Sequence, residues 1–130
     1  LNNQPAAQIN ITSAVITLDP SNPTTVVGGS TVKIKWSYNG ENSDPNKGGD
    51  PPYFYWTDHP PTSLDDYKNQ WRGNPERDIA GNITGNWSWD ITVPLNGKVY
   101  YWIVAYGANN SKSITPNLLN NQPAAQINIQ

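Results

Sequence analysis

Several residue types are scarce in this chain, and each shortage excludes a class of chemistry. The 130 residues contain no Cys and no Met, so neither a disulfide nor a Cys–His catalytic pair can form. The single histidine, His59, cannot supply a His-rich metal site. Charged residues make up 14% of the chain and the net charge is −2 without a basic cluster, which argues against nucleic acid as a partner. No apolar run approaches the length of a membrane span.

Asn, Thr, Gly and aromatic residues are abundant instead, with 6 Trp and 7 Tyr beside a single Phe. This composition is typical of a secreted or cell-surface β protein, and we therefore expect an extracellular location. The length suits one domain with a core of useful size. Because the chain begins with Leu rather than Met, we expect a mature product or a fragment.

One segment, LNNQPAAQINI, occurs twice: residues 1–11 return letter for letter as residues 119–129. Self-similarity at a fixed spacing indicates repeated units. Either the chain is one period of a tandem array, or residues 119–130 are a donor strand that completes a sheet from outside. A duplicated tag or cloning remnant is a third explanation, although the segment continues into a strand pattern without a break.

Each copy of the segment reads as a linker followed by a strand, because Pro fixes an extended backbone and the two Ile residues then alternate with polar ones. We assign residues 1–8 to a linker and residues 9–118 to a β-sandwich module. Residues 119–130 are predicted to be a linker and the first strand of a following module, or a donor strand. The predicted interface between units consists of the isoleucines of both copies, Ile9, Ile11, Ile127 and Ile129.

Most of the remaining sequence alternates between apolar and polar residues, which predicts strands. The clearest are residues 32–38, with Lys33 and Lys35 toward solvent, and residues 87–93. Turn residues separate about seven such strands, the pattern of an antiparallel β-sandwich.

One segment departs from this alternation. Ser63 and Asp66 have the spacing of a capping box, and Leu64, Tyr67 and Trp71 follow at helical spacing. The sequence therefore predicts one short helix near residues 64–71, lying on the sandwich.

Two stretches resemble a known family. GSTVKIKW at residues 29–36 is similar to strand B of fibronectin type III and related immunoglobulin-like modules, and YYWIVAYG at residues 100–107 is similar to their strand F. GNWSWDITVP at residues 85–94 resembles strand E of surface-anchored members. The resemblance implies an immunoglobulin-like sandwich in an extracellular setting and carries over no catalytic residue.

The aromatic residues predict a second apolar surface. If Val99 and Tyr101 point into the core, their neighbours along the same strand must point outward. The predicted outer aromatic face comprises Tyr53, Tyr55, Tyr100, Trp102 and Tyr106. A face this apolar is usually covered or used. The helix, a subunit interface or a stacked sugar are the candidate covers.

The polar loop before residue 53 suggests a cation site. Alternate oxygen-bearing positions in DPNKGGD favour Ca²⁺, although the Glu usual at the end of such loops is absent. The candidate ligands are Asp44, Asn46, Gly48 and Asp50, and calcium is the only cofactor that we consider. A solvated turn is the alternative interpretation.

Four Asn-x-Ser/Thr tripeptides are candidate glycosylation sites, at Asn10, Asn82, Asn86 and Asn109. His59 lies in the turn DHPP, and no Ser has the context of a nucleophile, so we predict no enzyme and no catalytic residues.

These observations favour a structural role. We expect a module of an extracellular filament, stalk or surface array, whose partners are copies of itself joined head-to-tail through the duplicated segment. The alternative is a carbohydrate-binding or adhesin module that uses the outer aromatic face, with glycans as partners.

Overall fold

The structure is a computed structural model that describes residues 7, 16–38, 40, 43–106, 112–114 and 124–130. These residues form ten strands in two sheets, with a single short 3-10 helix, η1 (Pro45–Lys47). The predicted all-β class is therefore confirmed. The described strands are more numerous than the seven expected.

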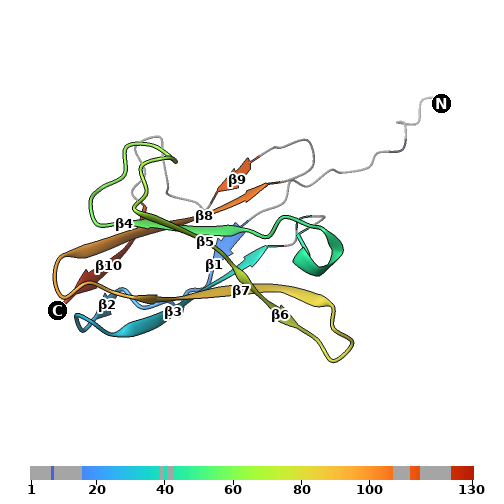
Figure 1. Cartoon of the computed structure of the whole chain (residues 1–130), viewed down its shortest axis with the longest axis horizontal. Helices are drawn as coiled ribbons and strands as arrows, with labels where there is room; N and C mark the ends of the chain where they lie inside the picture. Colours follow the sequence, from blue (N-terminus) through green and yellow to red (C-terminus); the bar gives the residue numbers. More distant parts are fainter. Residues whose placement is uncertain (1–6, 8–15, 39, 41–42, 107–111, 115–123) are drawn as a thin grey trace.

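The two sheets lie one above the other in Figure 1. The four-stranded sheet has the order β1 (Ile16–Leu18), β3 (Thr31–Tyr38), β7 (Ile83–Thr92), β6 (Asn74–Arg77). The six-stranded sheet has the order β2 (Thr25–Val26), β10 (Ala125–Ile129), β8 (Lys98–Tyr106), β4 (Tyr53–Thr57), β5 (Asn69–Arg72), and β9 (Lys112–Ile114) also pairs with β8. Among the described strands every pairing is antiparallel except that of β2 with β10.

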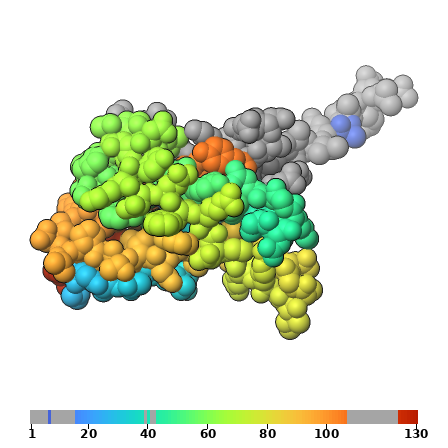
Figure 2. Space-filling model, viewed as in Figure 1, coloured from blue at the N-terminus to red at the C-terminus, as the bar shows by residue number. Residues whose placement is uncertain are grey.

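The helix predicted near residues 64–71 is wrong. The Asp66 N–H donates to the Ser63 carbonyl at 3.2 Å, which closes a turn but does not start a helix. From Lys68 onward the chain runs beside β4, where its N–H donates to the Trp56 carbonyl at 2.8 Å. Pairing with β4 satisfies the backbone of residues 69–72 and outweighs the local helical spacing. Residues 58–68 are instead a loop that projects at one end of the molecule, in light green in Figure 2.

The chain crosses from the larger to the smaller sheet at Gly73, which separates β5 from β6 (Figure 1). The Gly73 N–H donates to the Pro52 carbonyl at 2.8 Å. A Cβ atom here would lie 2.4 Å from Cζ2 of Trp36. Only glycine lets the backbone pass this close to the core.

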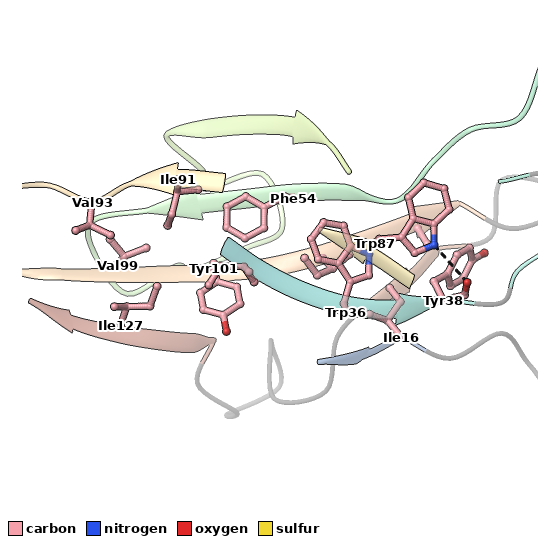
Figure 3. Packing of buried hydrophobic residues seen from close by; sticks show 13 residues of the cluster. Ile16, Trp36, Tyr38, Phe54, Trp87, Ile91, Val93, Val99, Tyr101 and Ile127 are labelled. Carbon is pink, nitrogen blue, oxygen red and sulfur yellow. Dashed lines mark hydrogen bonds between the residues drawn. The ribbon is translucent and has the colours of Figure 1, made fainter. Parts of the chain in front are cut away.

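The core lies between the sheets because alternate residues of β3, β7 and β8 point inward. Lys33 and Lys35 are exposed on the opposite side of β3, as the alternation predicted. Figure 3 shows four aliphatic side chains, Ile91, Val93, Val99 and Ile127, at one end of this core and the two indoles with Tyr38 and Ile16 at the other. The labelled residues are Ile16, Trp36, Tyr38, Phe54, Trp87, Ile91, Val93, Val99, Tyr101 and Ile127.

Candidate functional site

The second copy of the repeated segment forms β10, an internal strand of the larger sheet. On one side it pairs antiparallel with β8, where Ile127 lies opposite Val99. On the other side it pairs parallel with β2, where Ile129 lies opposite Val26. Just beyond the strand, the Gln130 N–H donates to the Val26 carbonyl at 2.8 Å. The segment is thus paired along both of its edges.

The side chains of β10 alternate between the core and solvent. Ile127 is 0% exposed inside the core, and Ala125 and Ile129 are partly buried against the same cluster. Asn128 points to solvent. The strand predicted at the end of the chain is therefore present, with both of its isoleucines directed into the sandwich.

The place of this strand differs from the expectation. The sequence suggested that it belongs to a following module or inserts into a neighbour, whereas in this structure it completes the sheet of its own chain. The physical reason is that β2 and β8 are one strand apart, and a segment with alternate apolar residues satisfies both of their edges. We call this place between β2 and β8 the β10 position. Ile9 and Ile11 of the first copy lie outside the described residues.

The predicted outer aromatic face exists as a second, separate apolar cluster. Val99 and Tyr101 point into the main core, and Trp102 and Val104 point to the other side of the sheet, as the alternation of β8 requires. Tyr55 is 5% exposed and Trp102 is 0% exposed, and their rings stack at 5.8 Å. Burial raises the pKa of Tyr55 well above its ordinary value.

This cluster is already covered by the chain itself. Leu64 packs against it, and the Tyr67 ring meets that of Tyr55 edge-on at 4.8 Å. The other predicted members, Tyr53, Tyr100 and Tyr106, are partly buried around it. The described cover thus includes the loop 58–68, without a helix, and Ala124 just before β10 is buried in the same cluster, so Trp102 is not a platform open to a sugar.

The exposed tryptophan lies elsewhere. Trp71, expected on the predicted helix, is on β5, is 45% exposed and stacks on Trp89 of β7 at 5.4 Å. Trp56 lies in the same cleft. Trp71 lies in a polar stretch two residues after Asn69, a pattern that fits an exposed edge strand and could have placed it on β5. The helical spacing of Leu64, Tyr67 and Trp71 was the stronger signal and indicated a helix instead.

The predicted calcium ligands are engaged with protein groups. The Asp44 carboxylate caps η1 by accepting the Asn46 N–H at 2.9 Å, and it accepts from Arg77 Nη2 at 3.0 Å. These contacts, first the bond from Arg77, lower the pKa of Asp44. Asp50 accepts from the Tyr53 hydroxyl at 2.8 Å. Gly48 ends η1 with φ 75°. Calcium would have to displace Arg77, and the site stays a prediction that a melting temperature in EDTA and in calcium would test.

The remaining predicted positions are polar and peripheral. Asn82 and Asn86 are exposed, so a glycan on either would remain in solvent, whereas Asn10 and Asn109 lie outside the described residues. His59 Nε2 lies 2.8 Å from Asp66 and its Nδ1 lies 3.2 Å from Asp58. These carboxylates, Asp66 first, raise the pKa of His59. The histidine thus holds the loop 58–68 together.

Comparisons with known proteins do not assign the chain to a family. No protein-family model and no curated protein matches the chain. Among the described residues there is no helix long and apolar enough to cross a membrane.

Proposed function

We propose that this chain is a structural module of an extracellular filament, stalk or surface array. The repeated segment would link neighbouring units by forming the same sheet strand in each of them. One observation carries the proposal: the second copy fills an internal strand position and buries Ile127 completely. A segment that closes a sheet in one unit and recurs at the other end of the chain is suited to close the same sheet in another unit.

We also infer that the sandwich is immunoglobulin-like. The order β1-β3-β7-β6 opposite β10-β8-β4 supports this, because it corresponds to an A-B-E-D sheet facing a G-F-C sheet. In that description β10 is the last strand, G. The parallel pairing of β2 with β10 then corresponds to a first strand that switches sheets.

The two copies are interchangeable in sequence. Residues 7–11 match β10 letter for letter, so Ile9 would occupy the place of Ile127 and Ile11 that of Ile129. The main-chain hydrogen bonds to β2 and β8 do not depend on side chains. We therefore expect the first copy to fit the β10 position without a change in packing.

Chain length prevents the first copy from filling the β10 position of its own molecule. If Thr12 replaced Gln130, it would lie beside Gly28, whose N–H donates to the Gln130 carbonyl at 3.2 Å. The chain must then reach Ile16, which pairs with Tyr38 at the far end of β3. The four Cα–Cα steps from residue 12 to residue 16 cover at most about 15 Å. The eight residues of β3 alone span about 23 Å. If the first copy fills a β10 position, that position must therefore belong to another unit.

This conclusion holds for both kinds of linkage. In a tandem array, residues 1–11 would be the last strand of the preceding module. In a strand-exchanged polymer, they would be the donor to a separate subunit. Either way, each unit consists of strands β1 to β9 plus one copy of the segment.

Because the segment is present twice, the proposed linkage can be tested by changing one copy while the other stays intact. Ile127→Asp places a charge at a buried position of β10, which should expel this strand and leave the β10 position open. The intact residues 7–11 of a second molecule should then fill it. We expect light scattering coupled to size exclusion to show multimers whose share rises with concentration.

Ile9→Asp is the matched control, because it makes the same change in the other copy. It should leave the mass of the parent chain unchanged, and the double variant Ile9→Asp/Ile127→Asp should form no multimers. A monomeric, destabilised Ile127→Asp chain would contradict the linkage. So would multimers that persist in the double variant, since these would be nonspecific aggregates.

A further inference from the structure

The flank of the sandwich opposite β10 contains a small aromatic cleft. Its lining residues come from β4 and β5 of the larger sheet and from β7 of the smaller one. Figure 1 shows these strands near the crossing from β5 into β6. Its volume is about 220 Å³. Its lining consists of Trp56, Asn69, Trp71, Trp89, Asp90, Ile91 and Thr92, which we call the tryptophan cleft.

The cleft is open because β6 covers only part of β7. The pairing of β6 with β7 ends at Ser88, and among the described residues no strand pairs with β7 on that side from Trp89 to Thr92. On the opposite wall, β5 pairs only with β4 in the described part of the chain. The main core is therefore closed here by indole rings rather than by a strand.

The rings leave one aromatic surface available. Trp71 and Trp89 stack with centroids 5.4 Å apart and planes 13° from parallel. Trp89 and Trp56 pack against the core, which fixes them, while Trp71 remains 45% exposed. Lys68 Nζ lies 5.9 Å from the Trp56 ring centroid and is itself bonded to Asp58. The cleft thus has a rigid apolar wall with one ring facing solvent.

Apart from Ile91, the other lining residues are polar, and the local charge is balanced. Asn69 contributes an amide. Thr92 and Asp90 alternate with Trp89 and Ile91, so their side chains lie on the outer face of β7. There the Thr92 hydroxyl lies 2.9 Å from that of Thr31, and the Asp90 carboxylate is paired with Lys33 at 3.2 Å. This pair leaves no excess of either sign to attract an ionic ligand. The chemistry favours a neutral ligand that has one apolar face and several hydroxyl groups.

We propose that the tryptophan cleft binds a single pyranose ring of a neutral oligosaccharide. A pyranose presents an apolar C–H face, which would stack on the exposed indole of Trp71. One of its hydroxyl groups would meet the amide of Asn69, which lies opposite Trp56 on the neighbouring strand. The volume is below the ~300 Å³ at which pockets for drug-sized ligands begin, so one ring rather than several is expected inside. The proposal does not depend on the linkage of units, because the cleft and β10 are at opposite flanks.

The test is an NMR titration of the full chain with neutral oligosaccharides, namely β-glucan, mannan, xylan, galactan and chitin oligomers. At least one should bind, with the ring protons of one sugar unit shifted upfield by the Trp71 indole. Trp71→Ala should weaken that binding about tenfold or more, and Trp71→Phe should retain part of it.

Tyr67→Ala is the matched control, because Tyr67 is also aromatic and 38% exposed but lies outside the cleft. It should leave sugar binding unchanged. Thermal melts of each variant will show that the fold is retained. The proposal is overturned if no oligosaccharide in the panel binds, or if binding is unaffected by Trp71→Ala. Loss of binding with unchanged multimers, or the reverse, separates this inference from the proposed linkage.

Discussion

The two flanks of the sandwich are closed in different ways. At the β10 flank, a strand is inserted between β2 and β8 and hydrogen-bonded on both sides. At the β5 flank, the chain crosses between the sheets at Gly73, and the gap beside it is filled by the stacked rings of Trp71 and Trp89. One closure uses the main chain and the other uses particular side chains.

This difference determines what each flank can exchange. Main-chain pairing accepts any strand with the right alternation, so an identical segment from another unit can replace β10. Stacked indoles have no such substitute in the sequence, because residues 69–92 occur only once. The β10 flank is therefore suited to assembly, and the β5 flank is suited to a fixed site.

The largest effect that we expect on the stability of a single chain is at the β10 flank. Ile127→Ala should lower the free energy of unfolding by about 2–5 kcal/mol, because the side chain is 0% exposed. Ile129→Ala is the control within the same strand and should cost less, since Ile129 is only partly buried. Urea titrations measure both. Equal costs would mean that β10 is not seated as described.

The next effect is at the crossing of the other flank. Gly73→Ala should cost about 1–3 kcal/mol, because the new Cβ would lie 2.4 Å from Trp36 and 3.0 Å from the Pro52 carbonyl. Gly48 is the control position, because its φ is 75° but a Cβ atom there would meet no atom within 4 Å. Gly48→Ala therefore measures the cost of backbone strain without a clash. A Gly73 variant no less stable than the Gly48 variant would contradict the close passage at the crossing.

The sequence predicted the β10 flank better than the β5 flank. Alternation placed Ile127 and Ile129 in a strand and separated Tyr101 from Trp102 on β8, because period two leaves only two faces for a strand. The alternation could not show which unit contains that strand, because the sequence of a strand does not specify which strands it pairs with.

At the β5 flank, local spacing misled. Leu64, Tyr67 and Trp71 are spaced as on a helix, yet they reach different places: Leu64 and Tyr67 cover the second cluster, and Trp71 stacks on Trp89. The residues of β5 and β6 are mostly polar, so their sequences, NQWR and NPER, do not show the alternation of apolar and polar residues that predicts a half-buried strand. β5 pairs with β4 across the loop 58–68, and β6 pairs with β7 across residues 78–82, so each is held by a neighbouring strand rather than by an apolar pattern of its own.

A smaller effect is expected for the stacking of Trp71 on Trp89, which closes the β5 flank. Trp71 is partly exposed, so its contribution beyond buried area is the stacking on Trp89, about 0.5–1.5 kcal/mol. A double-mutant cycle with Trp71→Leu and Trp89→Leu isolates this coupling. The same cycle applied to Ile129 and Trp71 should give no coupling, since they lie at opposite flanks. Coupling between that distant pair would break the comparison.

The smallest effect that we expect is a pH dependence of stability, which only the β5 flank should show through the charge on His59. β10 has no titratable side chain, whereas the loop leading into β5 is held by His59 between Asp66 and Asp58. The pKa of His59 is raised in the folded state, so its stabilisation is fully present below the unfolded value of about 6.5 and is lost as pH rises through the folded pKa. The melting-temperature difference between the parent and His59→Gln should therefore shrink from about pH 5.5 to about pH 8. Ile129→Ala should shift the melting temperature equally across that range, because no proton is linked to its packing. A pH-independent His59→Gln difference would mean that the loop 58–68 stays closed without the charge on the imidazole.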